Sequence, residues 1–115
     1  MAGSVIDGAA FEELQQTAGT EFVTELVDTF LTEAPSMLAE LRESFANGDP
    51  ERFRRAAHSL KSNGNTFGAL TLGTLARDLE LAGVVHVRNR GPSALADIEA
   101  EYMRVAAALA SLRDE

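Results

Sequence analysis

The fold of this chain is decided by residues 49–68, which read DPERFRRAAHSLKSNGNTFG. Asp49-Pro50 signals a helix start, because an aspartate side chain accepts hydrogen bonds from the first free amides and proline fits the first helical position. After this start, small and apolar residues recur at steps of three and four, the spacing of one helix face. They are Phe53, Ala56, Ala57, Leu60, Gly64 and Phe67. The segment therefore predicts a helix over residues 50–67 with one buried face.

The same spacing extends through most of the chain and predicts four further helices. We expect them at Phe11–Ala18, from Thr20 to the Asn47-Gly48 turn, at Ala69–Ala82, and from Gly91-Pro92-Ser93 to about Leu112. Pro35 lies inside the second of these segments and should kink or split it. Residues 83–91 are expected to form a loop, although Val84-Val85 could extend the preceding helix.

Four long helices with one apolar face each, joined by short connections, can bury those faces together. We therefore predict an all-α fold, an antiparallel up-down four-helix bundle with a short additional N-terminal helix at residues 11–18. The composition agrees, because alanine and leucine dominate and runs of β-branched residues are absent. A chain of 115 residues that is 45% apolar fits one small core. We expect a single domain over residues 1–115.

The composition also excludes several classes of function. Lysine and arginine number 10 against 18 aspartates and glutamates, and the resulting net charge of −8 disfavours binding to nucleic acid. Without cysteine there is no disulfide scaffold, thiolate metal site or thiol nucleophile. No apolar run approaches the roughly 18 residues of a membrane-spanning helix, and the first ten residues do not resemble a signal peptide. We expect a cytoplasmic monomer with neither nucleic acid nor membrane as a partner.

His58 is the residue that first points to a function. A helix advances about 100° per residue, which turns His58 about 160° away from the direction of Leu60 and of the buried face. The imidazole is therefore predicted to face solvent. The polar residues predicted to share or flank this outer face are Arg54, Arg55, Lys61, Ser62 and Asn65.

The surroundings of His58 differ in charge from the rest of the chain. Between Arg52 and Arg77 there is no aspartate or glutamate, whereas the segment carries four arginines and Lys61, the only lysine. Such a segment on an acidic protein can attract an acidic partner or a phosphoryl group. Lys61 lies one helical turn from His58, and an ammonium suits a single phosphoryl oxygen. The competing interpretation is an ordinary solvated helix face.

The segment from His58 to Ala69 resembles the signature of histidine-containing phosphotransfer (HPt) domains. In that family a histidine is followed by leucine two residues on, lysine three on and glycine ten on. Those matches are His58, Leu60, Lys61 and Gly68, while Ser62 stands where glycine is commonest. The flanking sequence is similar as well, at Phe30–Pro35, at Gly48-Asp49 and at Leu79-Glu80. The resemblance covers most of the chain.

The resemblance implies a phosphorelay intermediate with an exposed histidine on a four-helix bundle. His58 would accept a phosphoryl group from the aspartyl phosphate of a receiver domain, or from a sensor or hybrid histidine kinase, and pass it to another receiver. Lys61 would stabilise that group, and a partner would dock on Arg54, Arg55, Ser62 and Asn65. No cofactor is expected in this chain, and magnesium should belong to the receiver. Because the sequence has no nucleotide-binding motif, we expect a carrier and not an enzyme.

Three other interpretations remain open at the level of sequence. The protein could bind receivers as an adaptor without being phosphorylated, or it could be a structural bundle that self-associates. A metal enzyme is the third, but bundle metal sites use Glu-x-x-His pairs. Neither His58 nor His86 has a glutamate three residues before it. His86 is expected to be an ordinary exposed loop residue.

Overall fold

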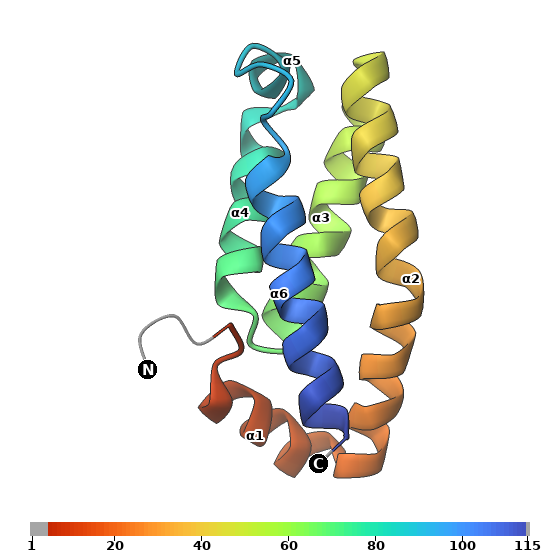
Figure 1. Cartoon of the computed structure of the whole chain (residues 1–115), viewed down its shortest axis with the longest axis vertical. Helices are drawn as coiled ribbons and strands as arrows, with labels where there is room; N and C mark the ends of the chain where they lie inside the picture. Colours follow the sequence, from red (N-terminus) through yellow and green to blue (C-terminus); the bar gives the residue numbers. More distant parts are fainter. Residues whose placement is uncertain (1–4, 115) are drawn as a thin grey trace.

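The chain forms an elongated helical bundle (Figure 1). The computed structural model describes residues 5–114, so residues 1–4 and 115 of the expected domain lie outside the described part. The described residues form six helices and no strand. These are α1 (Gly8–Ala18), α2 (Thr20–Asn47), α3 (Pro50–Thr66), α4 (Leu70–Ala82), α5 (Val84–Arg88) and α6 (Ala96–Arg113).

The four long helices α2, α3, α4 and α6 close into a ring, in which each packs against two neighbours. Successive long helices run in opposite directions, so the predicted antiparallel up-down bundle is confirmed (Figure 1). Helix α1 packs against α2 at one end of the bundle, and α5 lies at the other end against α2, α3 and α4 (Figure 1).

The helix ends follow from local chemistry. The side chain of Asp7 accepts from the amides of Ala9 and Ala10 at the start of α1, and that of Asp49 accepts from Arg52 at the start of α3. Each bond satisfies an amide that has no partner within the helix. Between α3 and α4 the chain turns at Gly68, whose φ of 79° is open to glycine and strained for other residues.

The core is formed by the predicted apolar faces. The whole set predicted around Leu60 is buried, five residues on α3 and Phe67 directly after it, and Phe53 and Leu60 are 0% exposed. Across the core, Phe30 of α2 contacts the rings of Phe67 and Tyr102, with centroids 5.5 and 6.0 Å apart. Because α3 is anchored along one face, its opposite face is held in a fixed orientation toward solvent.

Three expectations about element boundaries are corrected. Helix α2 continues through Pro35 without a break, and Ala34 and Leu38 on either side of it are buried. The φ of proline suits a helix, so burial on both sides outweighs one missing hydrogen bond. The expected loop at residues 83–91 contains helix α5, because Val84 and Val87 both enter the core. The last helix begins at Ala96, several residues after Gly91.

No helix in the described part of the chain combines the length and the apolar character needed to cross a membrane.

The core position of Leu60 gives a first prediction. Replacing Leu60 with Ala should lower the free energy of unfolding by about 2–5 kcal/mol, because a cavity forms in a closely packed core. Urea unfolding measures the change. The matched control is Leu81→Ala, since Leu81 is 73% exposed on α4, and it should change stability by less than about 0.5 kcal/mol. Equal effects of the two substitutions would contradict the described packing of α3.

Candidate functional site

His58 lies on the outer face of α3, as predicted. Its side chain is 53% exposed, while Ala57 and Leu60 on the same helix are fully buried. The core contacts of α3 therefore present the imidazole to solvent and prevent the helix from rotating it inward. An exposed histidine in the middle of a rigid helix is accessible to a second protein.

The imidazole is not free on both sides, because a carboxylate of α4 holds it. The Nδ1 atom of His58 lies 2.9 Å from Oε2 of Glu80, and the Nζ atom of Lys61 lies 2.7 Å from Oε1 of the same group. One carboxylate thus joins the predicted acceptor and the predicted stabilising lysine. The side chain of Glu80 is only 15% exposed, so this bridge is partly shielded from water.

The charge state of Glu80 decides which nitrogen of His58 carries the proton. The hydrogen-bonding ammonium of Lys61, assisted by His58, holds the pKa of the Glu80 carboxyl below its usual value, and partial burial opposes this only in part. Glu80 is therefore ionised at neutral pH and can only accept hydrogen bonds. Nδ1 of His58 must be the donor, which in the neutral ring leaves a lone pair on Nε2.

Sequence reasoning missed the role of Glu80. The sequence shows Leu79-Glu80 only as a similarity in the flank of the signature, and nothing in its local pattern links Glu80 to His58. A signal was nevertheless present. In an antiparallel helix pair, residues equally distant from the turn lie side by side, and His58 and Glu80 are equally far along the chain from Ala69.

The predicted positively charged segment is largely neutralised in three dimensions, which corrects the sequence interpretation. Acidic residues outside the segment pair with three of its five cations. The pairs are Arg52 with Glu40 and Glu43, Arg54 with Glu51, and Lys61 with Glu80. Within residues 5–114, Arg55 and Arg77 form no ion pair. The count along the sequence failed because α2 and α4 bring carboxylates to α3 from the sides.

The four residues predicted to dock a partner all lie on exposed parts of α3, but in different surroundings. Arg54 is paired with Glu51 of its own first turn, at 2.8 Å. Arg55 is exposed and faces the neighbouring helix α2. Ser62 is exposed. The side chain of Asn65 lies over Gly73 of α4, so it also belongs to the contact between α3 and α4.

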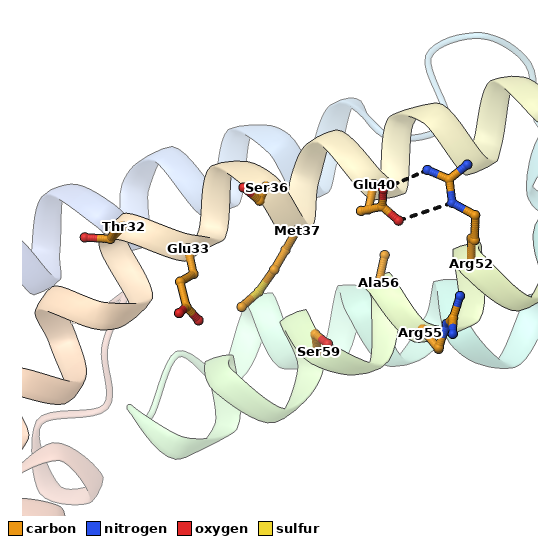
Figure 2. A pocket seen from close by; sticks show the side chains of 9 residues that line it. All are labelled: Thr32, Glu33, Ser36, Met37, Glu40, Arg52, Arg55, Ala56 and Ser59. Carbon is orange, nitrogen blue, oxygen red and sulfur yellow. Dashed lines mark hydrogen bonds and ion pairs between the residues drawn. The ribbon is translucent and has the colours of Figure 1, made fainter.

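A groove of about 570 Å³ runs between α2 and α3 (Figure 2). Its lining residues are Thr32, Glu33, Ser36, Met37, Glu40, Arg52, Arg55, Ala56 and Ser59. The side chain of Met37 points from α2 across the groove toward α3, and a bidentate pair between Arg52 and Glu40 spans the two helices nearby (Figure 2). Ser59, the neighbour of His58 in the chain, lines the groove on the α2 side of α3, whereas the ring of His58 contacts Glu80 of α4.

The described residues give little support to a metal site or to a role for the second histidine. Residues 5–114 contain no cluster of three or more histidine, aspartate or glutamate side chains placed to hold a metal ion. His86 lies on α5 and is exposed, with no hydrogen bond or ion pair to another described side chain. The bridge of His58, Glu80 and Lys61 therefore remains the principal candidate.

Comparison with known proteins decides the family. A family model described as the Hpt domain matches residues 25–115. The chain belongs to the Hpt family. Its fold is similar to the crystal structure of histidine-containing phosphotransfer protein B from Pseudomonas aeruginosa PAO1, with a TM-score of 0.86 and 25% sequence identity. The similarity covers 98% of this chain and 97% of the other. Among the curated proteins no match is found.

Membership of the Hpt family settles the general function. The chain is a histidine phosphotransfer protein, an intermediate in a two-component phosphorelay. Hpt domains are phosphotransfer carriers and not enzymes in the usual sense, and they interact with the receiver domains of response regulators and with histidine kinases. The predicted resemblance to HPt domains is confirmed.

The lowered pKa of Glu80 gives a prediction about pH. A carboxyl group whose pKa is lower in the folded than in the unfolded protein stabilises the folded state at any pH above its ordinary pKa, which for Glu80 is 4.5. This stabilisation is lost as the pH falls through the pKa of the group in the folded state. Wild type should therefore be more stable than Glu80→Gln at neutral pH, and the difference should shrink as the pH falls below about 4.5 and through the lowered folded pKa. Urea unfolding across this range measures it.

The control for this prediction is Lys61→Met. The ammonium of Lys61 is the largest cause of the lowered pKa of Glu80. In a protein that already carries Lys61→Met, the change Glu80→Gln should therefore alter the free energy of unfolding with a weaker dependence on pH. A difference between wild type and Glu80→Gln that stays constant with pH would show that the bridge is absent in solution.

Proposed function

We propose that His58 is the phosphoacceptor of this Hpt protein and that its Nε2 atom is the nucleophile. The single observation that carries the proposal is the contact between Nδ1 and the ionised carboxylate of Glu80. This contact places the proton of the neutral ring on Nδ1 and leaves the Nε2 lone pair available. The exposure of the ring allows a partner's phosphoryl group to approach it.

The transfer step then follows from this geometry. The Nε2 lone pair attacks the phosphorus of an aspartyl phosphate on a receiver domain, in line with the P–O bond that breaks. An N–P bond forms, and the electron pair of the broken bond remains on the aspartate carboxylate. Nδ1 keeps its proton, so the phosphorylated ring is cationic, and the carboxylate of Glu80 compensates this charge. The same arrangement serves the reverse transfer to a second receiver.

Lys61 is well placed to stabilise the phosphoryl group. Its ammonium has three N–H donors, of which one is used by Glu80 at 2.7 Å. The remaining donors can bond to phosphoryl oxygens and offset the negative charge that collects there. The receiver domain would supply the magnesium ion, which would neutralise charge on the phosphoryl oxygens.

We propose that the partner docks over the outer face of α3 and the adjacent groove. Arg55 lines the groove, lies one turn before His58 and has no ion pair within residues 5–114, so its guanidinium is available to an acidic side chain. Arg54, Ser62 and Asn65 lie on the same exposed helix. We expect the protein to act as a monomer, because docking needs this face of α3 to be uncovered. We also expect it to act in the cytoplasm.

The phosphoacceptor can be tested by labelling. After incubation with a receiver domain charged by a small phosphodonor, wild type should carry acid-labile phosphate, and His58→Gln should carry none, because the nucleophile is gone. The matched control is His86→Gln, which removes the only other histidine and should be labelled like wild type. Phosphorus NMR distinguishes the N–P bond from phosphate esters.

If His58→Gln were labelled like wild type, another residue would be the acceptor. If wild type stays unlabelled by every receiver tested but still binds them, the chain acts as a receiver-binding adaptor. If light scattering detects a stable dimer that buries His58, the structural bundle is the better description.

The groove gives a separate prediction about docking. Met37→Glu places a charge in the groove and should weaken binding to a receiver by roughly tenfold, which corresponds to about 1.4 kcal/mol. Leu81→Glu is the matched control on α4 and should bind like wild type. Isothermal titration calorimetry with the same receiver compares them. Equal weakening by both variants, or by neither, would place the docking surface elsewhere.

A further inference from the structure

Two buried glycines face each other where α3 crosses α4. Gly64 lies on α3 and Gly73 on α4. A Cβ atom added to Gly64 would lie 3.1 Å from the backbone nitrogen of Gly73 and 3.2 Å from the carbonyl oxygen of Ala69. Both are backbone atoms, so room for a methyl group requires movement of α4 itself. The missing side chain of Gly64 therefore sets the distance between the two helices.

Asn65 completes this contact from the solvent side. Its side-chain oxygen occupies the space that a Cβ atom would fill on Gly73, and its Cγ atom lies 3.0 Å from that position. Asn65 itself is exposed, whereas Gly73 is buried. Glycine lowers the stability of a helix interior relative to alanine. A methyl group on Gly73 would meet the carboxamide of Asn65, which would have to move aside.

The contact of Asn65 with Gly73 and the pair of His58 with Glu80 lie on the same two helix faces. Asn65 follows His58 by seven residues on α3, and Glu80 follows Gly73 by seven residues on α4. Seven residues are about two helical turns, or about 10.5 Å along the axis. Because the helices are antiparallel, the pair of His58 and Glu80 repeats the pair of Asn65 and Gly73 two turns away. A displacement at the glycines is thus carried along a rigid helix to Glu80.

We propose that Gly64 and Gly73, with Asn65 seated on Gly73, are positioning residues for the phosphoacceptor. They fix the spacing and register of α3 and α4 at which the carboxylate of Glu80 reaches both His58 and Lys61. Those hydrogen bonds are 2.9 and 2.7 Å long, and a shift of a few tenths of an ångström weakens both. The functional part of this inference rests on the proposed role of His58, but the geometric part does not.

The test compares Gly64→Ala and Gly73→Ala with wild type. Nitrogen NMR of the His58 ring reports the fraction of neutral ring that carries its proton on Nδ1. In both variants this fraction should fall toward that of Glu80→Gln, and the maximal rate of phosphoryl transfer should fall severalfold, while the receiver affinity of Gly64→Ala is unchanged. The matched control is Gly8→Ala in α1, where nothing lies within 4 Å of the added Cβ. It should behave like wild type.

A second pair of variants keeps the proposal testable if Gly64→Ala fails to fold. Adding Asn65→Ala to Gly73→Ala removes the side chain that the new methyl group would meet, so the proton of His58 should return to Nδ1. The proposal is overturned if folded Gly64→Ala or Gly73→Ala keeps the wild-type ring spectrum, or if the double variant restores nothing. A wild type with the expected spectrum but no transfer would overturn the proposed function and leave the positioning role intact.

Discussion

The shared carboxylate of Glu80 is the interaction on which the rest of the site depends. It binds Nδ1 of His58 and Nζ of Lys61 at once, so a single group from α4 orients the nucleophile and its neighbouring cation. Neither residue on α3 could be held this way by its own helix. The bridge in turn requires α3 and α4 to lie close together, and the packing at Gly64 and Gly73 makes that approach possible.

The electrostatics of the site are local and not a property of a broad charged surface. Carboxylates of α2 and α4 and of the first turn of α3 pair with most cations of the segment from Arg52 to Arg77. Of the five cations in this segment, Arg55 and Arg77 form no ion pair with another described residue. The net charge of the chain is −8, while Arg55, one turn before His58, forms no ion pair among the described residues.

Much of the fold and part of the site could be predicted from residue spacing. The buried set on α3 was identified correctly because helical periodicity is a short-range property, and the outward direction of His58 follows from the same rotation per residue. Helix α5 and the uninterrupted path of α2 through Pro35 were missed, because burial against other helices decided them. Glu80 was missed for the same reason, since its partners lie on another helix.

The sequence by itself determined the long helices of this Hpt domain, the face that α3 buries and the histidine left in solvent. These depend on residues within a few positions of each other, whose relation is set by the geometry of a helix. Only the tertiary structure decided which carboxylate meets which cation, which nitrogen of His58 holds the proton, and where a groove opens between α2 and α3. Those features depend on distances between helices, and such distances arise from packing across the whole core.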